Sequence, residues 1–164
     1  MKTYLKILTT STLVTLSTWG AISFAHSEHF TKNTRSAEQS YDFRTATMTV
    51  YKWYLSPMGA MVKGKTEFNA KAFAQYADGL ATASHLNLME GFPKDSGEDH
   101  VDDSDAKEAI WKNMKDFAAK YESLKNEAKA LAKVSKTGDE AAMKAQFKKT
   151  AGACTACHKK YKTK

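Results

Sequence analysis

The chain has 164 residues, of which 42% are hydrophobic and 26% are charged, and its formal net charge at pH 7 is +7. This length and composition suit a single folded domain with a substantial core. A positive balance can indicate nucleic-acid binding, but here the lysines alternate with acidic residues, and no run of arginines interleaves with aromatic residues. We therefore interpret the charge as a solvated surface and exclude a nucleic-acid footprint.

The first residues have the pattern of an export signal that does not belong to the fold. Lys2 and Lys6 precede an uncharged run from 7 to 24, and residues 23–25 read Ser-Phe-Ala, the small-x-small form of a cleavage site. The many serines and threonines of the run favour a cleaved signal over a membrane anchor. We expect cleavage after residue 25, which leaves residues 26–164 as the mature domain, with a net charge of +5 and no membrane segment.

The first helix is predicted to begin near Ser36 and to end at Gly64, because glycine suits a C-terminal cap. One stripe recurs at steps of three and four and comprises Tyr41, Arg44, Met48, Tyr51, Leu55, Met58 and Val62. Pro57 falls inside this stripe, so the helix is expected either to kink or to restart there.

A second helix is predicted from Asn69, which suits an N-cap, to Leu88. Its apolar edge comprises Phe73, Tyr76, Leu80 and Ala83. Gly79 lies within it and is a residue often accepted where two helices approach closely. Residues 91–103 combine turn residues with acidic side chains and lack a period, which predicts one long loop.

A third helix is predicted to begin at Ser104 as its N-cap, with Asp105 and Glu108 in the first turn, where the helix dipole favours anions. Its apolar residues repeat with a 4-3-4-3-4-3 spacing and are Ile110, Met114, Phe117, Tyr121, Leu124, Ala128 and Leu131. This spacing is typical of the seam of a helix in a left-handed bundle. Gly138 is expected to end the helix.

A fourth helix, capped by Asp139, completes the pattern. Its stripe comprises Met143, Phe147, Thr150, Cys154, Cys157 and Tyr161. Four amphipathic helices with short connections and no strand-like alternation predict an all-α fold, an antiparallel up-down four-helix bundle.

The fourth helix carries the strongest chemical signal, the pentapeptide Cys-Thr-Ala-Cys-His at residues 154–158. Two thiols three positions apart, followed directly by an imidazole, form the attachment signature of a c-type haem. On one helix face Cys154 and Cys157 can each form a thioether with a haem vinyl group, and His158 then lies under the iron as an axial ligand. Export fits this chemistry, since in bacteria haem is joined to such a motif after translocation, and a free thiol pair would otherwise tend to oxidise to a disulfide.

Other interpretations of the pentapeptide are weaker. A thioredoxin-like redox pair needs a strand–helix–strand pattern, which the sequence lacks. A structural zinc site needs four ligands at paired spacing, but these are the only two cysteines, and His85 and His100 lie far off in sequence. Two buried cysteines beside a surface histidine are disfavoured by the complete motif and the export signal.

The first helix is the natural source of groups for the haem face opposite His158, because it neighbours the fourth helix in an up-down bundle. The Met48 thioether can ligate haem iron, although a methionine on an apolar stripe is usually core filler. Arg44, one turn earlier, requires an anion, and the haem propionates are available ones, although its side chain can instead extend to water.

The chain from residue 26 onward resembles cytochrome c′, the class II c-type cytochromes. The resemblance rests on residues 154–162 (CTACHKKYK), 44–48 (RTATM), 58–64 (MGAMVKG) and 110–111 (IW), and elsewhere on the helical pattern. It implies one haem c held by Cys154 and Cys157, with His158 as the proximal ligand. It also implies that Arg44 lies near a propionate and that Met48 shields the distal face.

The resemblance assigns further roles around the haem. Lys162 matches a basic residue beside the proximal histidine, Tyr161 matches an aromatic that packs near the haem, and Phe92 corresponds to another. Thr45 stands where the family often has glutamine or glutamate, so the resemblance does not support a second polar contact with the propionates at this position.

The resemblance implies two functions that differ at Met48. In cytochrome c′ proper the iron is five-coordinate and high-spin, and an apolar distal pocket admits small uncharged diatomics such as NO and CO. In low-spin relatives a methionine at this position is the sixth ligand, and the protein is a simple electron carrier. Arg44 favours the five-coordinate form.

An enzyme such as a peroxidase is not expected. That chemistry usually needs a distal histidine or arginine over an open site. His85 is a lone histidine at a helix edge, and the remaining ones outside the motif, His26, His29 and His100, lie in polar segments.

The first helix also predicts a partner. Tyr51, Trp53 and Tyr54 give it more aromatic surface than a monomeric bundle needs, and family members are commonly homodimers through the first two helices. We therefore expect a periplasmic homodimer through helices 1 and 2, with a redox protein as its other macromolecular partner.

Overall fold

The computed structural model describes residues 35–163, whose regular elements are helices. The elements are α1 (Ala37–Val62), α2 (Ala70–Ala83), the 3-10 helix η1 (Leu88–Gly91), α3 (Ala109–Lys112), α4 (Met114–Ser135) and α5 (Glu140–Tyr161). The expected export signal, residues 1–25, lies outside the described residues. Between residues 35 and 163 no helix is long and apolar enough to cross a membrane.

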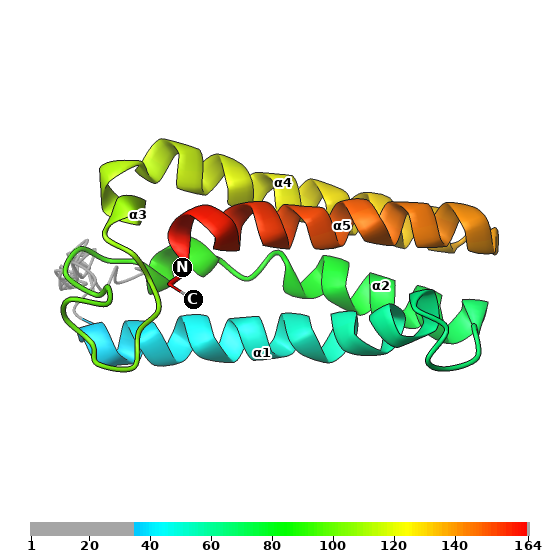
Figure 1. The fold of residues 1–164 in the computed structure, drawn as a ribbon, viewed down its shortest axis with the longest axis horizontal. Helices are drawn as coiled ribbons and strands as arrows, with labels where there is room; N and C mark the ends of the chain where they lie inside the picture. The colour runs from blue at the N-terminus through cyan, green and yellow to red at the C-terminus, as the bar shows by residue number, and fades with distance from the viewer. Residues whose placement is uncertain (1–34, 164) are drawn as a thin grey trace, which may run out of the picture. The chain divides into compact units, whose positions relative to one another are not determined.

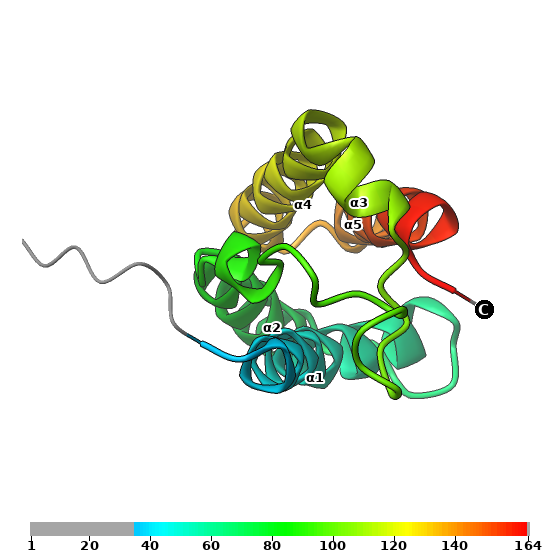
Figure 2. The ribbon, with the colours of Figure 1, turned by 90° about the vertical axis from the view of Figure 1, so that its left-hand side faces the viewer.

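The long helices α1, α2, α4 and α5 run alternately in opposite directions (Figure 1) and surround one core when viewed end-on (Figure 2). Each packs closely against the next one along the chain. α1 and α5 close the ring, but they pack much less closely against each other than the other neighbours do. The predicted antiparallel four-helix bundle is confirmed, and it is open on the side between its first and last helices.

The predicted ends of α1 are confirmed by their caps. The Ser36 hydroxyl accepts a hydrogen bond from the backbone N–H of Gln39 at 3.2 Å, and the Gln39 side chain accepts one from the Ser36 N–H at 3.0 Å. Gly64, just past the helix, has a φ of +67°, which glycine adopts without steric cost. The helix continues through Pro57 without restarting.

The predicted end of the second helix at Leu88 is wrong, because α2 ends at Ala83. The cause lies on α4, where the Tyr121 hydroxyl contacts two carbonyl oxygens, that of Ser84 at 2.8 Å and that of Leu86. These carbonyls therefore find their partner in another helix, and the chain turns away from the α2 axis. The segment then forms η1.

The predicted start of the third helix at Ser104 is also wrong. Residues 92–108 form a loop (the 92–108 loop), α3 follows it, and Asn113, with φ of −136° and ψ of 40°, separates α3 from α4. The Ser104 hydroxyl caps no helix, because it accepts hydrogen bonds from Arg44 Nη2 at 2.7 Å and from the Ala106 N–H at 3.2 Å. The apolar spacing nevertheless holds. Its buried members are Ile110, Phe117, Tyr121, Leu124, Ala128 and Leu131.

The seams of the helices meet in one core. Its largest fully buried apolar side chains are Phe73, Met58, Leu80, Ile110, Leu131 and Met143. A Cβ at Gly79 would lie 2.2 Å from Cε1 of Tyr54, so this glycine is required for the close approach of α1 and α2. Of the aromatic residues expected on the surface, Trp53 is 73% exposed, whereas Tyr51 is only 3% exposed and belongs to the core.

Candidate functional site

The open side of the bundle contains a cavity of about 540 Å³. All of the predicted site residues line it, namely Arg44, Thr45, Met48, Phe92, Cys154, Cys157, His158, Tyr161 and Lys162. Most of the remaining wall is apolar and comes from Leu55, Leu88, Ile110, Phe117, Leu124 and Ala153. Residues far apart in sequence therefore converge on one pocket, whose volume lies within the range of about 300–1,000 Å³ that is typical of small-molecule and cofactor sites.

The α5 wall of the cavity carries the pentapeptide motif. Cys154 and Cys157 lie one helical turn apart, are partly buried and are free thiols. Burial raises the pKa of both thiols, that of Cys157 to about 11. Both sulfurs are therefore protonated at neutral pH.

The imidazole of His158 lies at the exposed rim of the same wall. Partial desolvation lowers its pKa, and the nearby ammonium of Lys162 lowers it further. Both effects favour the neutral imidazole, which is the form that binds a metal ion.

The α1 wall faces α5 across the cavity. Thr45 is exposed at its edge, and the side chains of Met48 and Leu55 are half-buried in it. Tyr51 lies between them and is the buried aromatic residue of this wall. Met48 therefore lies where the sequence predicts it, on the helix opposite the motif.

Aromatic rings form the wall between α4 and the end of α5. The Phe117 ring makes edge-on contacts with Phe92, at a centroid separation of 4.7 Å, and with Tyr161, at 5.2 Å. The Tyr161 hydroxyl donates a hydrogen bond to the carboxylate of Asp116 at 2.5 Å. Asp116 also accepts one from Lys160 at 2.9 Å, so Tyr161 is held in a fixed orientation beside the motif.

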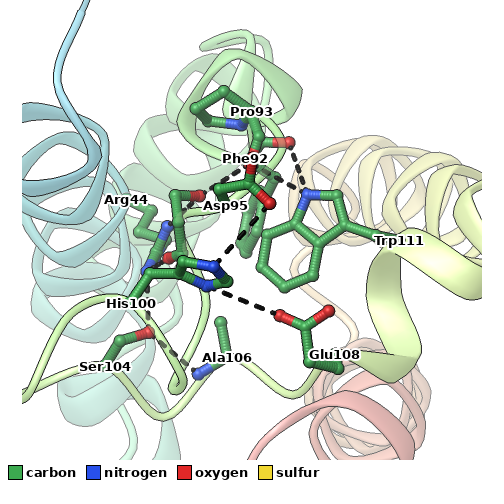
Figure 3. Close-up of polar contacts among 10 residues, drawn as sticks. Arg44, Phe92, Pro93, Asp95, His100, Ser104, Ala106, Glu108 and Trp111 are labelled. Carbon is green, nitrogen blue, oxygen red and sulfur yellow. Dashed lines mark hydrogen bonds and ion pairs between the residues drawn. The ribbon is translucent and has the colours of Figure 1, made fainter.

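The side chain of Arg44 is 6% exposed and anchors the 92–108 loop (Figure 3). Its Nη1 donates hydrogen bonds to the carbonyl oxygen of Gly91 at 2.9 Å and to the Ser96 hydroxyl at 3.2 Å. Its Nη2 donates to the carbonyl oxygen of Ser96 at 2.5 Å and to the Ser104 hydroxyl at 2.7 Å. The guanidinium also lies over the Phe92 ring, 5.1 Å from its centroid.

These contacts bear on the predicted role of Arg44. The two terminal nitrogens already bind neutral acceptors of the loop, and burial lowers the pKa of the guanidinium. The four bonds leave Nε–H as a further donor. The contact with a haem propionate stays a prediction, whereas the loop contacts are a role that the sequence did not reveal.

The outer part of the loop is held by α3 and its flanks (Figure 3). The Trp111 indole N–H donates to the carbonyl oxygen of Pro93 at 2.9 Å, and a Cβ at Gly97 would lie 2.6 Å from the Trp111 ring. The His100 ring lies between two carboxylates, 3.7 Å from Asp95 and 3.9 Å from Glu108. His100 is thus a loop residue and does not line the cavity.

The end of α5 is joined to the same loop. Residues Ala106 and Lys162 form an isolated antiparallel bridge, and the Lys162 ammonium pairs with the carboxylate of Asp105. The Thr163 N–H donates to the Asp105 carbonyl oxygen at 2.8 Å. The loop therefore connects the Arg44 side of the cavity with the His158 side.

A helical bundle whose last helix presents Cys-x-x-Cys-His to an apolar cavity defines a c-type haem protein. The sequence profile of the family described as Cytochrome C' matches residues 39–162. Cytochrome c′ from Halomonas halodenitrificans is 34% identical over 124 residues, which cover 74% of this chain and 93% of that protein. The chain belongs to the cytochrome c′ family.

Two further comparisons agree with this assignment. Cytochrome c-554 from Cereibacter sphaeroides is 29% identical over 133 residues, which cover 81% of this chain and 86% of that protein. The solved structure of cytochrome c′ from Shewanella frigidimarina superposes with a TM-score of 0.74 at 32% identity, over 79% of this chain and 98% of that chain.

Members of this family carry one covalently attached c-type haem, and Cys154 and Cys157 are the thiols that hold it in this chain. The observed pocket fits such a group, because both thiols open into an apolar cavity and a histidine lies directly beside them. The predicted cofactor, one haem c, is thereby confirmed.

Proposed function

We propose that this protein binds NO and CO at a five-coordinate haem, and that the same haem transfers electrons. The observation that supports the proposal is the part of the α1 wall formed by Met48, Leu55 and the Tyr51 ring opposite the motif, since a crowded apolar surface selects small uncharged ligands. The haem supplies the iron that binds the gas and changes oxidation state.

The residues around the cavity have separate tasks in this proposal. His158 would bind the haem iron from α5, and its lowered pKa favours the neutral imidazole that such a bond needs. Met48 narrows the space on the α1 side and limits the size of what enters. Lys162, held by Asp105, keeps a positive charge beside His158, and Arg44 fixes the loop that closes this end of the bundle.

A second candidate function is a low-spin electron carrier in which Met48 is the sixth ligand. The observation that favours it is the position of Met48, which lines the cavity from the helix that faces the motif. A thioether there can bind haem iron and raise its reduction potential.

The optical spectrum of the purified holoprotein, with and without CO, separates the two functions. We expect broad high-spin bands that shift when CO is added to the reduced protein. Met48→Leu is the matched variant, because it keeps the apolar bulk and removes the sulfur. In the five-coordinate protein it should leave the spectrum without CO unchanged. Sharp low-spin bands that turn high-spin only in Met48→Leu would show that Met48 ligates the iron and would overturn the gas-binding proposal.

We infer that the protein works in the periplasm as a carrier and gas binder and not as an enzyme. Export is supported by the N-terminal sequence pattern and by the chemistry of haem attachment, which follows translocation. His158 is the only histidine among the described residues that line the cavity, and Arg44 is occupied by the loop, so no described side chain of those types is poised as a peroxidase acid–base.

We propose a homodimer through α1 and α2. Trp53 is 73% exposed and, with Lys52, Pro57 and Tyr76, lines a surface groove formed by these two helices. Large exposed aromatic residues commonly anchor interfaces.

Trp53→Glu is expected to weaken this dimer at least about 30-fold, the effect of losing an interface residue worth about 2 kcal/mol. Sedimentation equilibrium of the holoprotein measures the change. Ser123→Glu adds the same charge at an exposed position of α4 and should leave the dimer intact. If the wild-type protein sediments as a monomer, this interface does not exist.

A further inference from the structure

The side chain of Lys162 lies at the rim of the cavity, one helical turn beyond His158. The Lys162 backbone N–H donates to the carbonyl oxygen of His158 at 3.0 Å, and residues at this spacing lie on the same face of a helix. Desolvation lowers the pKa of the His158 imidazole, and the Lys162 ammonium lowers it further, so the two groups interact. The position of this ammonium therefore affects the electrostatic potential around His158.

The carboxylate of Asp105, on the 92–108 loop, holds the Lys162 ammonium. A lysine ammonium stands on a flexible four-carbon stem, so it needs partners to keep one position. In the structure it pairs with Asp105 and also donates to the carbonyl oxygen of Thr163 at 3.4 Å. The side chains of the ion pair are about half exposed, and isolated pairs of this kind contribute little, because ordering two side chains costs entropy. A stable position for the ammonium therefore requires further support.

The paired backbones on both sides of the ion pair supply this support. Ala106 and Lys162 form an antiparallel bridge, and the Thr163 N–H donates to the Asp105 carbonyl oxygen at 2.8 Å. The Thr163 hydroxyl also contacts the carboxylate of Glu98, on the same loop. Because these contacts already fix the two chain segments, less conformational entropy is lost when the side chains of Asp105 and Lys162 meet.

We propose that Asp105 is a positioning residue that holds the Lys162 ammonium beside His158 and thereby sets the reduction potential of the haem. This inference rests on the proposed electron transfer, with His158 as the iron ligand. Oxidation adds one positive charge to the haem, so a nearby cation opposes it and raises the reduction potential, whereas a nearby anion lowers that potential. Asp105 acts in two ways, through its own negative charge and through the place at which it keeps the positive one.

Spectroelectrochemical titration of the holoprotein tests the proposal with Asp105→Asn, Lys162→Gln and the double variant. Lys162→Gln should lower the reduction potential, because it leaves the Asp105 carboxylate unpaired at the cavity rim. Asp105→Asn should raise the potential in the Lys162→Gln background, where only a negative charge is lost. In the wild-type background the rise should be smaller, because the released ammonium moves away from His158 into water. A charge that acts alone gives equal shifts, so the difference between the two backgrounds measures the positioning effect.

Asp103→Asn is the matched control, because Asp103 lines the same cavity with the same charge but lies outside the Lys162 pair. Its shift in potential should be equal in the two backgrounds. Asparagine has the shape of aspartate and leaves the backbone bridge in place, so these variants are expected to fold. A rise for Asp105→Asn that is equal or larger in the wild-type background, or a Lys162→Gln potential equal to that of the wild type, would overturn this inference alone. A wild-type haem that is not reversibly reduced and reoxidised would overturn the proposed electron transfer as well.

Discussion

Replacing both Cys154 and Cys157 by alanine is expected to abolish the native fold together with covalent haem attachment. Without thioether bonds no covalent link retains the haem on α5, and the cavity of about 540 Å³ loses its filling. Apolar side chains of its wall, such as Leu55, Phe117 and Leu124, would then face water, which costs about 1.5–3 kcal/mol for each side chain that becomes fully exposed. Since the stability of a domain totals only about 5–15 kcal/mol, the bundle should collapse or lose its cooperative unfolding transition.

Two measurements check this expectation. Acidic organic solvent should extract no haem from the wild-type polypeptide, whereas the double variant should contain no haem that resists this treatment. Thermal unfolding of the double variant, followed by circular dichroism, should show no sharp transition. Cys154→Ala alone is the matched control, because Cys157 can still form one thioether, and it should retain its haem during extraction. Haem that resists extraction from the double variant would contradict attachment through these two thiols.

The sequence predicted those features of the bundle that depend on neighbours within one helix. The caps at Ser36, Asn69 and Asp139 lie where the local pattern placed them, because a cap is a contact across three residues. The haem motif is equally local, since Cys154, Cys157 and His158 lie within little more than one turn. Periodicity then sufficed to place them on the same face as the rest of the core.

The features that the sequence did not predict depend on contacts between distant segments. α2 stops at Ala83 because Tyr121, on another helix, binds the carbonyls that follow. Ser104 is of a residue type that N-caps prefer, and acidic residues follow it, yet its hydroxyl accepts a hydrogen bond from Arg44. Tyr51 lies on the same stripe as Met48, which predicts a buried side chain, but its neighbours Trp53 and Tyr54 led us to expect an exposed aromatic surface. In the structure Tyr51 is buried. Only the packing of whole helices decides such cases.

The buried guanidinium of Arg44 needs hydrogen-bond acceptors, and the 92–108 loop needs donors for its buried carbonyl and hydroxyl oxygens. An arginine on an apolar stripe needs partners when buried, and the sequence pointed to an anionic one. The described partners are instead two carbonyl oxygens and two hydroxyls, all from the segment 91–104. The guanidinium thereby fixes a loop that has no regular secondary structure of its own. Lys162 connects this loop to the end of α5.

Arg44→Ala is therefore expected to lower the free energy of unfolding of the holoprotein by about 3–5 kcal/mol, because it leaves several buried acceptors without a donor. Denaturant unfolding measures the loss, and hydrogen exchange should show the 92–108 loop opening first. Arg44→Lys should recover little of the loss, since one ammonium cannot reach acceptors on both sides of the planar fork.

Lys136→Ala removes the same charge from an exposed pair with Asp78, at 3.6 Å, and should change stability by less than about 1 kcal/mol. This control separates anchoring of the loop from a general loss of positive charge. If Arg44 served the haem propionates alone, its removal would shift the reduction potential and leave exchange in the loop unchanged. Faster exchange near Ser96 and Ser104 with an unchanged potential would instead assign the guanidinium to the loop. A change in both would mean that Nε–H reaches a propionate while the terminal nitrogens hold the loop, so that one side chain couples haem binding to closure of the bundle.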